Sequence, residues 1–290
     1  MYDFIKLEVK GKSFKELRNL DFQYKVSPKS GVFGNIDRNG KEYAIRADVL
    51  HKNLKIELIQ GKNEYITISG SLHKYFNEQN INYTDYTFGN FISTVQKIEN
   101  ELNIDKEDMR VLNLEYGVNI DTLLGVRKIL QNVIVHKKKE FCTPIYDANG
   151  FSKKAKHYNY DVKLYDKGLQ NKLDYDLMRY EISVNKPEML KDLGIIKLSD
   201  LNLECSNMLA NNLITQFKNI LLYDYLNDDD SPYNKLSNHL YWSNMLEKGK
   251  EKDYKNALKS YNYKIKKRPN SPKNILLEII NQKLDYLLKN

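Results

Sequence analysis

Three short segments of the chain alternate apolar with polar residues, which is the pattern of a β-strand with one buried and one exposed face. They cover residues 111–120, 158–167 and 178–184. In the first segment, the apolar positions are Leu112, Leu114, Tyr116, Val118 and Ile120. The alternation predicts three half-buried strands whose other side chains form polar faces.

The polar faces of these predicted strands share one kind of chemistry. They carry Glu115 on the first strand, Lys163, Tyr165 and Lys167 on the second, and Arg179 and Glu181 on the third. Side chains of one parity point to one side of a strand, so Glu115 is expected to be presented to solvent rather than buried. If the strands join one sheet, two carboxylates, a tyrosine and basic groups converge on one surface.

The chain up to residue 186 is predicted to be an α+β domain built on an antiparallel sheet with covering helices. Further alternating segments predict strands at residues 3–9, 22–26, 42–47, 54–60 and 64–71. Apolar residues at helical spacing predict helices at residues 88–102 and 122–133. A hairpin is expected within residues 136–152, where Asp147, Asn149 and Gly150 are typical turn residues.

From residue 187 onward the apolar period becomes helical, which predicts a second, all-helical domain over residues 187–290. Its helices are expected at residues 199–226, 237–247, 254–267 and 271–288, the last with Ser271 as cap and Pro272 at its first position. Residues 248–273 hold ten Lys or Arg and two acidic residues. Either a solvated helix face or a phosphate-binding surface explains this run, with Lys264, Lys266, Lys267 and Arg268 as candidate DNA contacts.

Composition favours a polyanionic partner. The 290 residues carry a formal net charge of +8, and clustered cations gain free energy by releasing counterions from phosphates. Lysine-rich usage in an AT-rich genome would also give this charge. The two cysteines have no zinc-like spacing and form no disulfide framework. We expect a cytoplasmic protein without a signal peptide or a membrane span.

Tyrosine, lysine and carboxylate together can cleave a phosphodiester. A tyrosine hydroxyl can attack the phosphorus and hold one strand end as a phosphotyrosine, but its ordinary pKa of about 10 means that it needs activation. A divalent cation or a lysine at the phosphate provides this activation by stabilising negative charge. Glu115 and Glu181 are suitable cation ligands, and His73 adds a nitrogen if the strand at 64–71 continues in phase. The plainer alternative is that such tyrosines pack and such glutamates are solvated or ion-paired.

Three patches resemble the phage and plasmid replication protein family typified by the filamentous phage gene II protein, and more distantly the rolling-circle plasmid initiators. Residues 68–91, ISGSLHKYFNEQNINYTDYTFGNF, look like the family's Ser/Lys patch leading through an Asn-containing turn into a helix. Residues 111–121, VLNLEYGVNID, are similar to its strand with an Arg-x-Asp core. The pair YDVKLYDKGLQN and LMRYEISV looks like its Tyr-x-Lys segment and its Arg-aromatic-Glu strand. The resemblance covers roughly residues 65–195.

The resemblance assigns roles residue by residue. It places the catalytic tyrosine on Tyr165, its lysine on Lys167, and the family's Arg and Glu on Arg179 and Glu181. Glu115 takes a position that is aspartate in the family, and the preceding arginine of the family is Asn113 here. The family's Gly-His-Asn turn is not present as such, and His73 precedes the expected place of the histidine.

What the resemblance implies is an HUH-like replication nuclease in residues 1–186 that nicks and rejoins one DNA strand at a phage or plasmid origin. Mg²⁺ or Mn²⁺ would be held by Glu115, Glu181 and His73. Lys163 would contact DNA, and Arg179 would orient Glu181 or contact DNA. The partners would be single-stranded or supercoiled origin DNA and a host helicase or polymerase, in the cytoplasm of a bacterial cell.

Two other interpretations stay open. The first is a relaxase or transposase-type strand transferase, although five scattered histidines are not expected to form the tight cluster usual in conjugative relaxases. The second is a noncatalytic DNA or RNA binder that uses the basic helices. It predicts salt-dependent binding without a metal requirement or a covalent adduct.

Overall fold

The structure is a computed structural model that describes residues 1–13, 16, 25–36, 42–60, 64–145, 147, 151–226, 236 and 239–290, with residues 25–36 and 42–45 described by their backbone. Its internal contacts divide the chain into two compact units. Unit 1 comprises residues 1–116, 183–208 and 287–290, and unit 2 comprises residues 117–182 and 209–286. The predicted domain boundary at residue 186 falls inside unit 1, because residues 183–208 belong to that unit.

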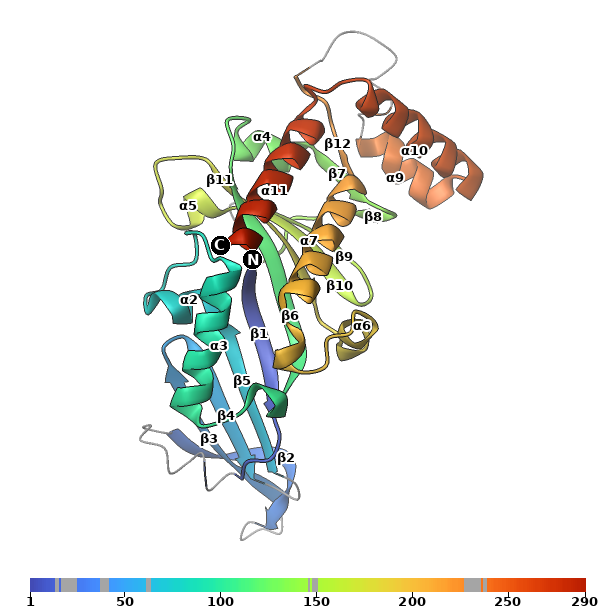
Figure 1. Ribbon diagram of the computed structural model, residues 1–290. Helices are drawn as coiled ribbons and strands as arrows, with labels where there is room; N and C mark the ends of the chain where they lie inside the picture. Colours follow the sequence, from blue (N-terminus) through green and yellow to red (C-terminus); the bar gives the residue numbers. More distant parts are fainter. Residues whose placement is uncertain are drawn as a thin grey trace. The chain divides into compact units, whose positions relative to one another are not determined.

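The described residues form a sheet of nine strands in the order β2-β3-β4-β5-β1-β6-β11-β10-β9 (Figure 1). The strands are β1 Tyr2–Val9, β2 Lys25–Ile36, β3 Glu42–His51, β4 Leu54–Gln60, β5 Glu64–Ser71, β6 Met109–Asp121, β9 Ser152–Lys156, β10 Tyr160–Asp166 and β11 Leu177–Val184. Neighbours from β2 to β6 pair antiparallel, and so do β10 and β9. The predicted α+β class with an antiparallel sheet is confirmed.

Unit 1 packs its sheet strands against helix α3, Phe88–Leu102 (Figure 1). The helix matches the prediction because Thr87 and Asn90 form a capping box at its start. Its buried face carries Phe91, Val95, Ile98 and Leu102, and the ring of Phe91 lies 4.4 Å from that of Tyr2. The other helical segments that begin in this unit are α2 Leu72–Asn77, α6 Pro187–Asp192, α7 Leu203–Lys218 and the short turns η1 Lys106–Asp108 and η2 Leu198–Asp200.

Unit 2 adds a second sheet, of three strands among the described residues, in the order β12-β7-β8. These strands are β7 Val133–His136, β8 Lys139–Glu140 and β12 Ile220–Leu222, and the helices are α4 Val126–Asn132, α5 Lys167–Gln170, α9 His239–Lys248, α10 Glu251–Lys266 and α11 Pro272–Lys289. The predicted helix over 199–226 ends early because residues 220–222 pair with β7. The region after residue 186 is therefore mainly helical but includes a strand.

Trp242 lies at the centre of a cluster that joins α9 and α10 to the small sheet. It is fully buried and packs with Val135, Leu221, Tyr254 and Tyr261. The hydroxyl of Tyr261 donates to the carbonyl of Leu222 and accepts from its backbone N–H, at 2.8 and 2.9 Å. These bonds fix the buried side of α10. In the described ranges, every helix is too short or too polar to cross a bilayer.

Candidate active site

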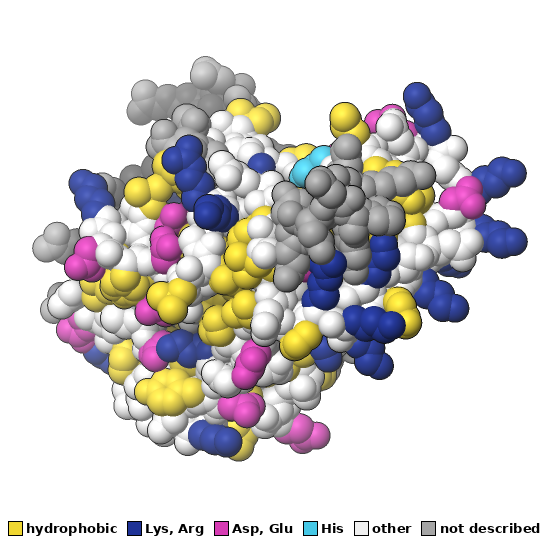
Figure 2. Space-filling view, turned by 90° about the horizontal axis from the view of Figure 1, so that it is seen from above, with side chains coloured by type: hydrophobic (Ala, Val, Ile, Leu, Met, Phe, Trp, Pro, Cys, Tyr) yellow, Lys and Arg dark blue, Asp and Glu magenta, His cyan; other side chains and the backbone are white. Residues whose placement is uncertain are grey.

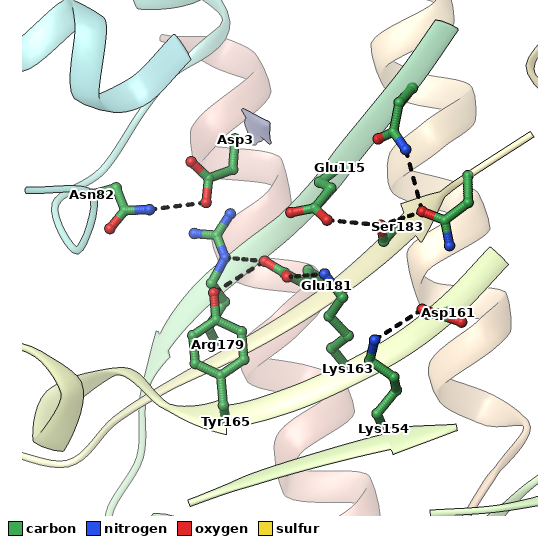
Figure 3. A network of polar contacts seen from close by, with 12 residues as sticks. Asp3, Asn82, Glu115, Lys154, Asp161, Lys163, Tyr165, Arg179, Glu181 and Ser183 are labelled. Carbon is green, nitrogen blue, oxygen red and sulfur yellow. Dashed lines mark hydrogen bonds and ion pairs between the residues drawn. The ribbon is translucent and has the colours of Figure 1, made fainter. Parts of the chain in front are cut away.

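Strands β10 and β11 bring four of the predicted residues of unit 2 together around one carboxylate (Figure 3). The Tyr165 hydroxyl donates to Oε2 of Glu181 at 3.1 Å. The Nζ atom of Lys163 lies 3.2 Å from Oε1, and the Nε atom of Arg179 lies 2.5 Å from Oε2. A tyrosine hydroxyl and two cations therefore share the two oxygens of Glu181.

Glu181 is not on an exposed face, in contrast to the prediction. All eight residues of β11 are buried, and the side chain of Glu181 is only 4% exposed. Arg179 is buried with it and also donates to Oδ1 of Asn119 at 3.0 Å. A buried carboxylate is tolerated when cations and hydrogen bonds satisfy it, so Arg179 orients Glu181 while its guanidinium faces the protein.

Gly117 on β6 makes room for this carboxylate. A Cβ atom at Gly117 would lie 2.5 Å from Cβ of Glu181 and 2.4 Å from the carbonyl oxygen of Tyr180. Both distances are shorter than van der Waals contact, so only glycine lets the two strands approach in this way. The signal was present in the sequence as an isolated glycine within a strand pattern.

Lys167 does not extend the polar face of β10, which corrects the prediction. The strand ends at Asp166, whose side chain accepts from the backbone N–H of Leu169 at 2.7 Å and caps α5. Lys167 is therefore the first residue of a helix and is buried. Its Nζ atom lies 5.5 Å from the centroid of the Tyr165 ring and donates to Gln170 at 3.0 Å. The lysine is thus close to the tyrosine, but through a different element.

The neighbouring strand β9 adds Lys154 to the face of β10 that carries Lys163 and Tyr165. The register pairs Tyr165 with Ser152 and Lys163 with Lys154, so these side chains share one face. Lys154 forms an ion pair of 3.1 Å with the buried Asp161. Beside them lies a cavity of about 600 Å³ that is lined by Pro144, Asp147, Phe151, Ser152, Lys153, Lys154, Lys163, Tyr165, Asp166, Leu169, Gln170, Lys172 and Glu181.

Glu115 belongs to unit 1, where it is half-buried rather than presented to solvent. The hydroxyl of Ser183 donates to its Oε1 at 2.7 Å (Figure 3). In the same unit, the buried Asp3 accepts from the amide of Asn82 at 2.9 Å (Figure 3). Sequence patterning did not indicate either contact, because each joins side chains far apart in the chain.

His73 lies on helix α2 and not on a continued strand, which also corrects the prediction. Ser71 ends β5 and caps the helix by accepting from the backbone N–H of Lys74 at 3.2 Å. The His73 ring is 2% exposed. It stacks on Tyr86 at 4.9 Å, and its Nε2 lies 2.9 Å from the hydroxyl of Thr84. His73 is therefore held by packing in unit 1.

The residues proposed for Mg²⁺ or Mn²⁺ do not fit a metal site as they lie. Across the described ranges, no three His, Cys, Asp or Glu side chains are grouped so that they could hold an ion. Glu181 already binds two cationic side chains, and oxygen ligands to a metal would have to replace them. The arrangement instead suits a carboxylate that accepts the proton of Tyr165.

The basic run after residue 248 is distributed over both sides of α10 and its end. Lys266 and Lys267 are exposed, and Lys264 is half-buried. Arg268 is also half-buried, with Nη1 3.3 Å from the buried carboxylate of Asp224. The four predicted DNA contacts therefore do not form one outward face.

Two of the five histidines meet in unit 2, a pairing that the sequence did not suggest. Nδ1 of the fully buried His136 lies 2.7 Å from Nε2 of His157. Burial, His157 and Lys137 lower the pKa of His136 to about 3, and burial with Lys137 and Lys139 lowers that of His157. The ring of His157 stacks on Tyr160 at 4.6 Å, so the pair is neutral and packed at neutral pH.

Comparisons with known proteins give little sequence similarity. No protein-family model matches the chain, and no curated protein is significantly similar to it. One similar solved structure is that of the rolling circle replication initiator protein from Geobacillus stearothermophilus, with 14% identity and a TM-score of 0.39. The similarity covers 85% of this chain and 94% of that one. At this level it does not assign a function to the chain.

Proposed function

We propose that this protein nicks and rejoins one strand of DNA at the origin of a phage or plasmid that replicates by a rolling circle, with Tyr165 as nucleophile. The observation that carries the proposal is the hydrogen bond from the Tyr165 hydroxyl to Glu181, a carboxylate held by Lys163 and Arg179. The motifs in residues 65–195 support the same chemistry through their resemblance to phage and plasmid replication proteins.

In the proposed reaction, Oη of Tyr165 attacks the phosphorus of one phosphodiester while Oε2 of Glu181 accepts the phenolic proton. The Tyr–O–P bond forms, the bond to the 3′-oxygen breaks, and that oxygen takes up a proton. The products are a 5′-phosphotyrosyl protein and a free 3′-hydroxyl that a polymerase can extend. The reverse attack by a 3′-hydroxyl rejoins the strand and restores the tyrosine.

Basic side chains around Tyr165 suit the charge of this reaction. Four lysines line the cavity together with Tyr165 and three carboxylates, namely Lys153, Lys154, Lys163 and Lys172 with Asp147, Asp166 and Glu181. The Nζ atom of Lys167 lies over the tyrosine ring. Ammonium groups at these positions attract a phosphodiester and stabilise the charge that builds on it in the transition state. A cavity of about 600 Å³ falls within the range of small-ligand pockets and can hold a nucleotide.

The role of a metal ion is proposed separately from the roles of Tyr165 and Glu181. The resemblance implies Mg²⁺ or Mn²⁺, which would neutralise the scissile phosphate, but Glu115, Glu181 and His73 are not grouped to hold it. Tyr165, Glu181 and the lysines account for the proton and the charge of the steps above without it. Origin DNA, single-stranded or supercoiled, is the proposed substrate, and a host helicase or polymerase the proposed partner.

A covalent-adduct assay tests the proposal. The full chain is incubated with labelled single-stranded oligonucleotides that tile the DNA flanking its gene, with Mn²⁺ or with EDTA, and an SDS-resistant adduct is mapped by mass spectrometry. We expect an adduct on Tyr165 that Tyr165→Phe abolishes. Tyr158→Phe is the matched control, because Tyr158 is 82% exposed in the same unit.

The other outcomes separate the alternatives. An adduct on a different tyrosine would overturn the site, and an adduct formed on transfer-origin or transposon-end DNA would favour a relaxase or transposase. If the protein binds these strands but no adduct forms with either Mn²⁺ or EDTA, the enzyme proposal is wrong and the protein is a nucleic-acid binder.

A further inference from the structure

Helix α10 has a buried side that fixes which residues point outward. Its buried residues Tyr254, Ala257, Tyr261 and Ile265 belong to the core cluster around Trp242. At about 100° per residue, Lys252, Lys259 and Lys266 fall within roughly 40° of one another on the opposite side of the helix. All three lysines are exposed, so the packing of the helix turns them together toward solvent.

We call Lys252, Lys259 and Lys266 the α10 lysine stripe. Its members are seven residues apart, which at about 1.5 Å per residue places them about 10.5 Å apart over roughly 21 Å. The acidic residues of α10, Glu251 and Asp253, both lie in its first turn. Figure 2 shows Lys and Arg side chains gathered over the part of unit 2 that α9 and α10 form.

The surroundings of the stripe are polar. Tyr263, 60% exposed, lies between Lys259 and Lys266, with Nζ of Lys267 over its ring at 4.4 Å. Asn256 and Asn262 are exposed on either side. A membrane-binding helix would instead show bulky apolar residues beside its lysines, and a single-strand groove would show a row of aromatic rings. One tyrosine among lysines and asparagines fits a phosphate backbone better.

We propose that the α10 lysine stripe binds the phosphate backbone of double-stranded DNA. A length of roughly 21 Å corresponds to about six base pairs at 3.4 Å each, so the three ammonium groups can reach phosphates spaced about three base pairs apart along a duplex. The choice of DNA rests on the proposed nicking function, for which a duplex arm beside the origin would be the ligand. Of the four residues that the sequence suggested as DNA contacts, Lys266 alone belongs to the stripe.

Duplex binding and its salt dependence test the stripe. Binding of the full chain to a fluorescein-labelled duplex of about 20 base pairs and arbitrary sequence is followed by anisotropy between about 50 and 200 mM NaCl. The test variant carries Lys252→Gln, Lys259→Gln and Lys266→Gln. The control carries Lys106→Gln, Lys128→Gln and Lys139→Gln, three exposed lysines on other elements, so both variants lose the same charge.

If three phosphate contacts are lost, the slope of log K against log salt falls by about 2.7 in the stripe variant. We expect its affinity near 100 mM NaCl to drop at least tenfold, with the control within about twofold of the parent. Equal slopes in the two variants would overturn the proposal. So would stripe-dependent binding to phosphatidylserine vesicles combined with unchanged duplex binding. Thermal melting of both variants verifies that they are folded.

The adduct assay separates this proposal from the nicking function. A short single-stranded oligonucleotide does not need the stripe, so the stripe variant is expected to form the Tyr165 adduct at the parental rate. Loss of duplex binding in a protein that forms no adduct would support the stripe and refute the nicking. An adduct at Tyr165 with duplex binding that ignores the stripe would refute the stripe alone.

Discussion

The hydroxyl of Tyr165 donates a hydrogen bond to Oε2 of Glu181 across a distance of 3.1 Å, and Arg179 donates to the same oxygen. A hydroxyl that already points at a carboxylate can lose its proton to it as it attacks a phosphorus. The second oxygen is held by Lys163, so the carboxylate is fixed in position before any substrate binds. The proposed nucleophile and the proposed base are therefore both held within unit 2.

Replacing Glu181 by Gln is expected to slow formation of the Tyr165 adduct about 10²- to 10⁴-fold, the usual contribution of a general base. The rate is measured on the oligonucleotide that gives the adduct with the parent, over a range of Mn²⁺ concentrations. Because the carboxylate is proposed to take a proton, no Mn²⁺ concentration should restore the rate.

Glu140→Gln serves as the control for Glu181→Gln, since Glu140 is an exposed residue of β8. Recovery of the Glu181→Gln rate at high Mn²⁺ would contradict a proton-accepting role and favour a metal ligand. Melting of the variant has to be checked as well, because Arg179 is left with a neutral partner and a broken buried pair destabilises.

Gly117→Ala is expected to destabilise unit 2, since the new methyl group would lie 2.5 Å from Cβ of Glu181 and 2.4 Å from the carbonyl oxygen of Tyr180. Overpacking of this kind costs about 1–3 kcal/mol. The free energy of unfolding is measured by urea titration, with Asp121→Ala, at an exposed position of the same strand in unit 2, as control. A Gly117→Ala variant that is as stable as the parent and reacts at the same rate would show that the strands can separate without cost.

Local patterns predicted the parts of the fold that depend on neighbours in the sequence. Strands β4 and β5 and helix α3 have the predicted limits. In each case the apolar residues recur at regular strand or helix spacing, and turn or cap residues stand at the ends of the segment. The alternation along β10 and β11 also predicted that Lys163 and Tyr165 would share a face, and Arg179 and Glu181 another.

Contacts between distant parts of the chain produce the features that the local sequence patterns did not predict. Alternation suggested an exposed face on β11, but other parts of the chain cover both faces, and no period within the strand reports this. Asp166 ended β10 by capping α5, which turned Lys167 out of the strand. The pair of His136 and His157 joins residues 21 positions apart, and only the folded chain brings them together.

Because Lys273 is buried, we expect unit 2 to become more stable as the pH rises above neutral. Burial lowers the pKa of its ammonium group to about 7, from an ordinary value near 10.5. Between these values the unfolded chain binds a proton that the folded chain does not, so the free energy of unfolding rises by up to about 1.4 kcal/mol per pH unit.

The measurement for Lys273 is urea unfolding at pH 7, 8 and 9, followed by the fluorescence of Trp242, the one tryptophan of the sequence and part of unit 2. Lys273→Met should remove the rise with pH, whereas Lys248→Met, at an exposed position, should keep it. A parent whose stability does not change over this range would refute the prediction.

Because His136 is buried, we expect the protein to lose stability in acid. Its pKa in the folded chain is lowered to about 3 from 6.5, and that of His157 is lowered as well. Below pH 6.5 the unfolded chain therefore binds protons that the folded chain excludes. As the pH falls from 6.5 toward 3, the exclusion of this proton by His136 makes unfolding easier by up to about 1.4 kcal/mol per pH unit, and the lowered pKa of His157 acts in the same direction.

The acid limit is measured by urea unfolding at pH 4.5, 5.5 and 6.5 with Trp242 as the probe. His136→Gln is expected to reduce the dependence on pH by about one proton, because the buried ring that resists protonation is gone. His239→Gln is the control, since His239 is exposed. If His136→Gln and the parent lose stability in parallel, other groups cause the acid sensitivity and the neutral histidine pair does not.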